Sequence, residues 1–119
     1  MSKKLTVKEI LDSRGQKKLT EIYTHTELEA EACEKAGVDM IITSELNDYT
    51  RIRSAAPNTF FTVGLSYGAH LDEYSILKRC FYLMNKGADA IYCPQSSRFI
   101  KAIADEGIPV IGHSGFIPY

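Results

Sequence analysis

The chain has 119 residues, of which 45% are hydrophobic and 24% are charged, and its formal net charge is −1. This length limits the chain to one domain, and the balanced charge excludes a strongly basic nucleic-acid-binding surface. Its apolar runs are too short to span a bilayer, and an apolar signal segment is absent near Met1. The three cysteines fall inside predicted helices and a strand, which is typical of reduced thiols, so we expect a cytoplasmic protein.

One pattern recurs along the chain. Residues 34–45 indicate the end of a helix, a glycine stop at Gly37, and a short apolar strand that runs into polar residues. Residues 85–93 and 105–113 repeat the pattern, and residues 55–63 repeat it with Pro57 as the helix stop. Regular alternation of helix and buried strand predicts an α/β fold with a parallel sheet, whose strands we expect to be covered on both faces.

The elements follow in order from the amino terminus. Capping-box patterns at Thr6–Glu9 and Thr26–Glu29 predict the starts of the first two helices, and Asp48 is a candidate cap for the third. The predicted strands are 19–23, 38–43, 59–63, 90–93 and 109–112. The later helices are predicted at 48–56, at 72–86, and through Phe99, Ile100 and Ile103.

Two helices show an apolar stripe. The second helix carries it on Leu28, Ala32, Cys33 and Ala36, and the fourth on Tyr74, Leu77, Phe81 and Met84 with Cys80 beside them. These patterns leave two folds open: consecutive strands of a barrel, or a five-stranded flavodoxin-like sheet with strand order 2-1-3-4-5.

Five segments in order resemble one family of enzymes. They are residues 6–11, 36–42, 56–58, 87–91 and 107–118, the last ending in Gly-His-x-Gly-x-x-Pro. In these segments the chain is similar to ketopantoate hydroxymethyltransferase, also called 3-methyl-2-oxobutanoate hydroxymethyltransferase. That family belongs to the barrel superfamily of phosphoenolpyruvate mutase and isocitrate lyase. The resemblance favours the barrel: residues 1–119 would form a single, partial TIM-barrel domain, about five βα units of a (β/α)8 barrel with an N-terminal helix.

The resemblance also implies a function. The family is a transferase of pantothenate biosynthesis that moves a one-carbon unit from methylenetetrahydrofolate to a small-molecule 2-oxo acid, with Mg²⁺ holding the charge of the enolate. We therefore expect a 2-oxo acid as ligand, and neither nucleic acid nor a membrane as partner. Because a partial barrel leaves strand edges exposed, we also expect a homo-oligomer or a longer polypeptide that covers them.

Four residues carry over as candidate site residues. The resemblance implies Glu45 as the metal ligand, Ser44 and Tyr92 as substrate-binding residues, and His113 as a catalytic residue. The family's other two metal-binding acids fall on Gly64 and Pro94, its substrate-pairing lysine falls on Tyr92, and its loop after the second strand shrinks to Leu46-Asn47. These departures predict that the chain alone is inactive. The alternatives are another enzyme of the superfamily acting on a 2-oxo acid, and a non-catalytic barrel fragment.

The sequence suggests two further hypotheses, one about a metal site and one about a reactive cysteine. His25, Glu45, His70 and His113 all follow predicted strands, so they could meet at one rim and hold a transition metal, although no short ligand spacing supports this. Cys93 ends the fourth predicted strand and is either a nucleophile or, as its apolar surroundings favour, a core residue.

Overall fold

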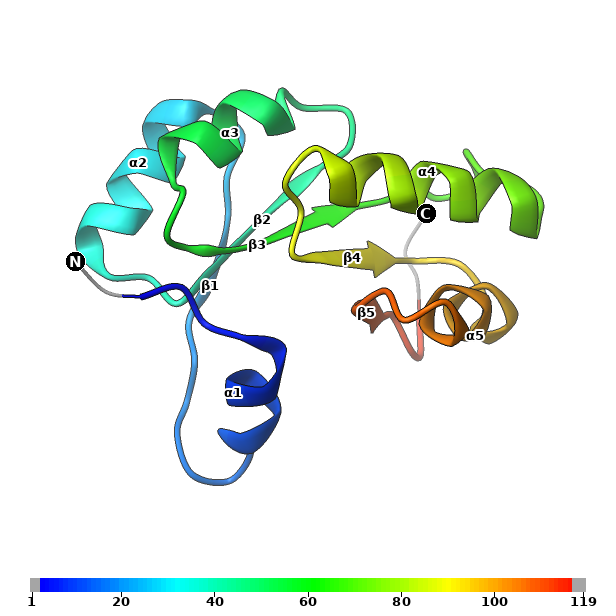
Figure 1. Cartoon of the computed structure of the whole chain (residues 1–119), viewed down its shortest axis with the longest axis horizontal. Helices are drawn as coiled ribbons and strands as arrows, with labels where there is room; N and C mark the ends of the chain where they lie inside the picture. Colours follow the sequence, from blue (N-terminus) through cyan, green and yellow to red (C-terminus); the bar gives the residue numbers. More distant parts are fainter. Residues whose placement is uncertain (1–2, 117–119) are drawn as a thin grey trace.

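The computed structural model describes residues 3–116 of the chain and shows helices alternating with the strands of one sheet (Figure 1). In chain order, the elements are α1 (Val7–Asp12), β1 (Glu21–Tyr23), α2 (Glu27–Ala36), β2 (Met40–Ser44), α3 (Tyr49–Ala55), β3 (Phe60–Gly64), α4 (Glu73–Asn85), β4 (Ala90–Cys93), α5 (Ser97–Asp105) and β5 (Val110–Gly112).

The sheet is parallel throughout, with the strand order β1-β2-β3-β4-β5. A helix connects each strand to the next, so the described residues form four consecutive βα units followed by β5. This is the order of successive strands in a (β/α)8 barrel, and it confirms that prediction. The flavodoxin-like alternative is wrong, because β1 lies at the edge of the sheet and not between β2 and β3.

The polar residues that were predicted to start helices do cap them. At Thr6, the hydroxyl accepts from the Glu9 N–H and the Glu9 carboxylate accepts in return from the Thr6 N–H, which completes a capping box. At α2, Thr26 accepts from the Glu29 N–H, but the Glu29 carboxylate bonds the N–H of His25 in place of that of Thr26. Gly37 ends α2 with a φ of 80°, in the left-handed region that glycine adopts without strain.

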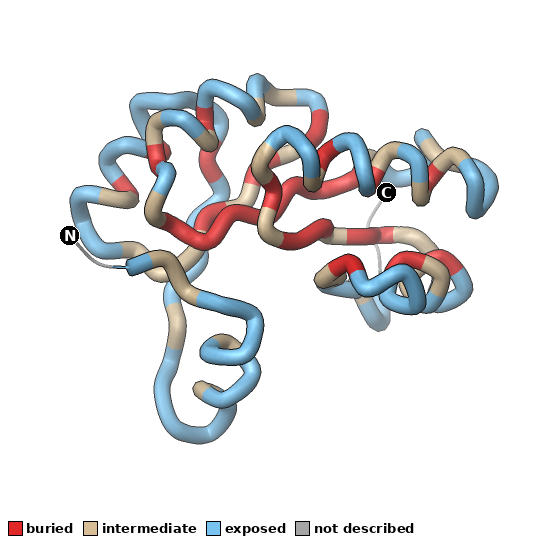
Figure 2. Tube along the Cα trace, viewed as in Figure 1, coloured by how far each residue is buried: buried red, intermediate tan, exposed pale blue. Residues whose placement is uncertain are grey.

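The two faces of the sheet differ in their cover. The covered face carries Ile41, Phe61, Val63, Ile91 and Cys93, which pack with side chains of α2 to α5 in one core. Helices contribute Ile52, Ile76, Cys80, Leu83 and Ile103 to that core. Figure 2 shows this buried material along β3 and β4 and on the sides of the helices that meet them.

The open face carries the alternate residues, including Ile42, Ser44, Gly64 and Tyr92. Residues of β2 are alternately buried and half-buried, so the prediction of full cover on both faces is wrong for this strand. Every residue of β3 is buried, so the prediction holds at the centre of the sheet. At the amino-terminal ends of the strands, Val7, Ile10 and Leu11 of α1 border an apolar cavity of about 400 Å³ on this face. Glu21 lies against the same cavity, and burial raises the pKa of its carboxyl group.

Two of the predicted helix faces need correction. Leu28 is 75% exposed, since Ala30 and Cys33 are the residues that α2 buries. In α4 the buried stripe is Ile76, Cys80 and Leu83, whereas Tyr74 and Phe81 are exposed. Helix α4 has apolar residues around most of its circumference, so its sequence contains two possible apolar stripes. Packing against the sheet determines which of the two is buried.

An ionic cluster joins α3 to the amino-terminal end of β4. The Arg53 guanidinium bonds Oδ2 of Asp89 at 2.9 Å and the carbonyl oxygens of Ala56 and Thr59 at 2.7 Å each. Asp89 also accepts from Lys4 Nζ and from the N–H of Phe61, so its carboxylate links three segments of the chain. Among the helices of residues 3–116, none is long and apolar enough to cross a membrane.

Candidate functional site

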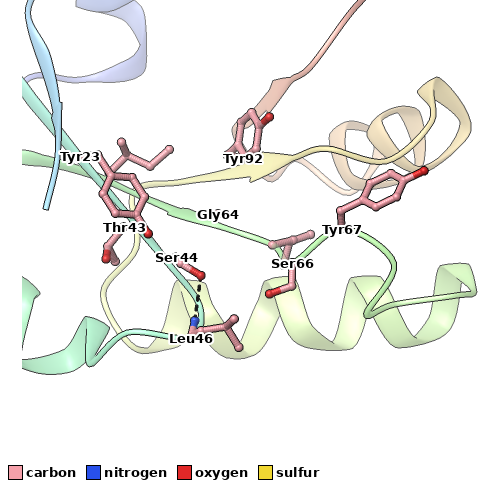
Figure 3. Close-up of a pocket in the computed structure, with 10 residues that line it drawn as sticks. Tyr23, Thr43, Ser44, Leu46, Gly64, Ser66, Tyr67 and Tyr92 are labelled. Atoms are coloured by element: carbon pink, nitrogen blue, oxygen red, sulfur yellow. Dashed lines mark hydrogen bonds between the residues drawn. The ribbon is translucent and has the colours of Figure 1, made fainter. Parts of the chain in front are cut away.

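The strands β2, β3 and β4 end at a cleft of about 560 Å³ on the open face (Figure 3). Parallel strands bring their carboxyl ends to one edge of the sheet, which is where α/β proteins place their binding sites. Tyrosine, serine and aliphatic side chains line this cleft: Tyr23, Ile42, Thr43, Ser44, Leu46, Gly64, Leu65, Ser66, Tyr67 and Tyr92. The described lining therefore offers hydroxyl groups and apolar surface, and it contains no aspartate, glutamate, lysine, arginine or histidine.

Ser44 and Tyr92, the two residues predicted to bind substrate, do meet in this cleft. The sheet register places Ser44 opposite Gly64, and Gly64 opposite Tyr92. Ser44 and Tyr92 therefore lie on the same face of the sheet with Gly64 between them, and the Tyr92 side chain packs over Gly64, where an added Cβ would come within 3.4 Å of Tyr92 Cδ2. The Ser44 hydroxyl oxygen accepts from the N–H of Leu46 at 3.1 Å, drawn in Figure 3, which leaves its O–H able to donate elsewhere.

His113 is hydrogen-bonded to the Tyr92 hydroxyl and does not itself line the cleft. The Tyr92 hydroxyl lies 2.6 Å from Nδ1 of His113, and Nε2 of His113 lies 2.9 Å from the carbonyl oxygen of Phe116. A carbonyl oxygen only accepts, so Nε2 carries a proton, and in the neutral imidazole Nδ1 accepts from Tyr92. The structure thus makes His113 a support for the Tyr92 ring, and its predicted catalytic role would act through that hydroxyl.

Glu45 is buried with its carboxylate directed at α4 and at the loop after β3. Its Oε1 accepts from Nε of Arg79 at 2.8 Å, and its Oε2 accepts from the N–H of Ser66 at 2.6 Å and lies 3.0 Å from Nε2 of His70. Burial alone raises the pKa of the Glu45 carboxyl, but the hydrogen bonds from Ser66, His70 and Arg79 outweigh it and hold the pKa below its ordinary value. Glu45 is therefore a paired anion inside the protein.

The described side chains do not fit the magnesium site that the resemblance implies. Magnesium is held by carboxylates, substrate oxygens and water. Both oxygens of Glu45 are already bonded, and glycine and proline stand at the other two acid positions, 64 and 94. Residues 3–116 contain no group of three or more His, Cys, Asp or Glu side chains placed to hold a metal ion. Glu45 as a metal ligand stays a prediction, and a cation would have to displace Arg79 and His70 from it.

The histidines of the transition-metal hypothesis do not gather. Only His70 reaches Glu45, whereas the N–H of His25 bonds the Glu29 carboxylate and the His25 ring packs against Tyr23. The chain thus places His25, His70 and His113 in three separate bonding environments around the rim of the sheet.

Cys93 lies in the core beneath the sheet, with no solvent exposure. Burial raises the pKa of its thiol, and burial with the neighbouring Cys93 raises the pKa of Cys80 to about 12. A thiol in this environment is a poor nucleophile, because the thiolate is the reactive form.

We therefore expect no thiol of the folded chain to react readily with iodoacetamide at pH 8, since Cys33, Cys80 and Cys93 are all buried. The same reagent in denaturant should modify all three. Mass spectrometry of the two samples gives the counts, and rapid modification of Cys93 in the folded chain would restore the nucleophile hypothesis.

Several residues of the site were not singled out from the sequence. Ser66, Tyr23 and Tyr67 line the cleft, and Arg79 neutralises Glu45 from α4. Ser66 and Tyr67 belong to the glycine-containing segment after β3. Its position at the end of a strand was the one sequence signal that could have indicated a place in the site. Arg79 lies 34 residues from Glu45, so no local pattern connects the two.

The sequence is similar to a group of known enzymes. No protein-family model matches the chain. It is 24% identical over 138 residues to the 3-methyl-2-oxobutanoate hydroxymethyltransferase of Kosmotoga olearia, covering 96% of this chain and 52% of that protein. The enzyme of the same name from Thermosipho africanus is 27% identical over 140 residues, with the same coverage. That from Tropheryma whipplei is 35% identical over 68 residues, covering 53% of this chain and 25% of that protein.

The chain is a divergent, partial relative of these hydroxymethyltransferases. It spans about half the length of the curated relatives it matches. The match to the Kosmotoga enzyme runs over 138 residues, more than the 119 of this chain, so the relative carries extra residues inside the matched span. The short Leu46-Asn47 connection beside the cleft agrees with such a difference. The recognition made from five sequence segments is confirmed.

Proposed function

We propose that the cleft binds a small 2-oxo acid without magnesium, and that this chain alone does not transfer a one-carbon unit to it. The observation that carries the proposal is the hydroxyl-lined cleft at the carboxyl ends of β2, β3 and β4. The names of the relatives support the ligand class, since those enzymes are named for their action on 3-methyl-2-oxobutanoate.

The chemistry of the lining suits an acceptor ligand with an apolar tail. The carboxylate and carbonyl oxygens of a 2-oxo acid only accept hydrogen bonds, and the Ser44 O–H has its hydrogen available to donate. Ile42, Leu46 and Leu65 supply the apolar contact that a branched alkyl group needs. The negative charge of Glu45 is compensated by the Arg79 guanidinium, which weakens its repulsion of an anion at the cleft.

The same lining argues against the transfer reaction. Forming an enolate from the ligand requires a base within hydrogen-bond reach of the C3 proton and positive charge near the enolate oxygen. The described lining residues include no side chain that is a base near neutral pH, and no lysine or arginine. His113 reaches the cleft only through the Tyr92 hydroxyl. We therefore propose a binding protein and not a complete catalyst.

Two measurements test this proposal together. Isothermal titration calorimetry with 3-methyl-2-oxobutanoate should give weak binding, with a Kd on the order of 1 mM. This Kd should stay the same when magnesium is added or chelated. The matched control ligand is 3-methylbutanoate, which lacks the 2-oxo group and should bind more weakly.

Proton exchange measures the chemistry. Incubation of 3-methyl-2-oxobutanoate with the chain and magnesium in D₂O should give no deuterium at C3 above the rate without protein, as followed by NMR. Exchange above that background would overturn the statement that the chain is not a catalyst. Binding that requires magnesium would restore the metal site and Glu45 as its ligand.

A further inference from the structure

Ser66 lies two residues beyond β3, in a part of the loop whose backbone is held firmly. Its N–H donates to Oε2 of Glu45 at 2.6 Å, and its carbonyl oxygen accepts from the N–H of Ala69 at 3.2 Å. The preceding residue, Leu65, donates its N–H to the carbonyl oxygen of Tyr92 at 2.9 Å. Glu45 is held in turn by Arg79 and His70, so a buried ion pair fixes the Ser66 backbone at the wall of the cleft.

The hydroxyl of Ser66 differs from the rest of the residue, because it has no hydrogen-bond partner. Its Oγ is shielded from solvent and bonds no other atom of the described chain. Buried hydroxyls are nearly always paired, since a lost bond to water has to be replaced. Ser44, which also lines the cleft, is paired in this way with the N–H of Leu46. An unpaired hydroxyl at a cleft wall indicates a missing acceptor or donor.

The Ser66 side chain can change its rotamer without losing a hydrogen bond. Oγ makes no bond that would have to break, and serine has three staggered positions about its Cα–Cβ bond. The backbone is fixed, so rotation about that one bond moves the oxygen relative to the cleft that the residue lines.

We infer that Ser66 is a ligand-binding residue whose hydroxyl donates to a carboxylate or carbonyl oxygen of the acid in the cleft. This inference rests on the proposed function and adds to it a second hydroxyl of the cleft lining, besides that of Ser44, as a determinant of the ligand class. The unpaired hydroxyl lowers the stability of the free protein and is satisfied when an acceptor oxygen is bound. Removing it should therefore have opposite effects on the free and on the bound protein.

The test is Ser66→Ala, measured against wild type by thermal unfolding and by calorimetry with 3-methyl-2-oxobutanoate. We expect the Tm of the free variant to rise by about 2–4 °C, because a buried unpaired polar group is removed. We expect the Kd for the acid to increase about tenfold, which corresponds to about 1.4 kcal/mol. A hydroxyl with a purely structural role would lower the Tm when removed and leave the Kd unchanged.

Thr24→Val is the matched control. The Thr24 hydroxyl is also buried and without a partner among the described residues, but Thr24 does not line the cleft. Its replacement by the isosteric valine should raise the Tm in the same way and leave the Kd unchanged.

The outcomes separate the two proposals. A wild-type chain that binds no acid overturns the proposed function and this assignment with it. Binding by wild type and Ser66→Ala with equal Kd, or a lower Tm for Ser66→Ala, overturns the assignment of Ser66 alone. A Tm increase with weaker binding, absent from Thr24→Val, supports it.

Discussion

Replacing Glu45 by glutamine is expected to lower the free energy of unfolding by about 2–4 kcal/mol at neutral pH. The variant keeps the size of the side chain but removes the charge that pairs with Arg79 and His70. Only 5% of the Glu45 side chain is exposed, so water cannot replace these partners. Urea denaturation should show a lower midpoint with an unchanged slope, which would mark a change in stability and not in the surface exposed.

The effect should depend on pH in one direction. The pKa of folded Glu45 lies below the ordinary glutamate value of 4.5, so its stabilisation is complete above that value. It is lost as the pH falls through the lower folded value, where the wild type also becomes neutral. The difference between wild type and Glu45→Gln should therefore shrink in acid.

Glu31→Gln is the matched control for Glu45→Gln. Glu31 also bonds a basic residue, Lys35 at 2.7 Å, but both side chains are exposed, and solvent screens such a pair. This variant should unfold close to the wild-type midpoint. Equal midpoints for Glu45→Gln and Glu31→Gln would show that the buried pair contributes nothing.

A second large loss of stability is expected for Arg53→Met, about 3–5 kcal/mol. The side chain is 14% exposed, and its guanidinium bonds the Asp89 carboxylate and the carbonyl oxygens of Ala56, Thr59 and Gly87. Methionine fills similar space without a donor, so the carbonyl oxygens lose the guanidinium and Asp89 keeps only Lys4 and the N–H of Phe61.

Arg51→Met provides the control for Arg53→Met on the same helix. Arg51 is 70% exposed, and its contacts with Glu27 and Asp48 are 3.7 and 3.5 Å long. Its loss should change the urea midpoint little. A midpoint for Arg53→Met as high as that for Arg51→Met would contradict the assignment of Arg53 as the link between α3 and β4.

The order of the elements was predictable from local signals. Capping residues such as Thr6 and Asp48 indicate where helices start, and Gly37 indicates where one ends. These signals are local because a cap bonds backbone groups within one helical turn of it. The strands were placed within two residues of their observed bounds, and Ala90–Cys93 agreed fully. Which apolar stripe of α4 is buried was not predictable, since Phe81 and Leu83 are equally apolar and the neighbouring sheet decides between them.

The site was predictable only in part, because contacts between distant segments of the chain decide where some of its side chains point. Ser44 and Tyr92 could be placed at strand ends, and parallel pairing then brought them to one cleft. The direction of the Glu45 side chain could not be read from its neighbours, because Arg79 and His70 come from distant segments. Ser66 carries no motif, and its unpaired hydroxyl is visible only once the loop is folded.

The sequential strand order has a consequence for how the chain acquires its structure. Each strand from β2 to β5 pairs with the one made just before it, and the paired residues are only 19 to 28 positions apart. Loops of this length close at modest entropic cost. As synthesis proceeds from the amino terminus, β1 waits only for β2, and each later strand meets a sheet edge that already exists. The sheet can therefore grow in one direction during translation, with the edge of the most recent strand as the template for the next.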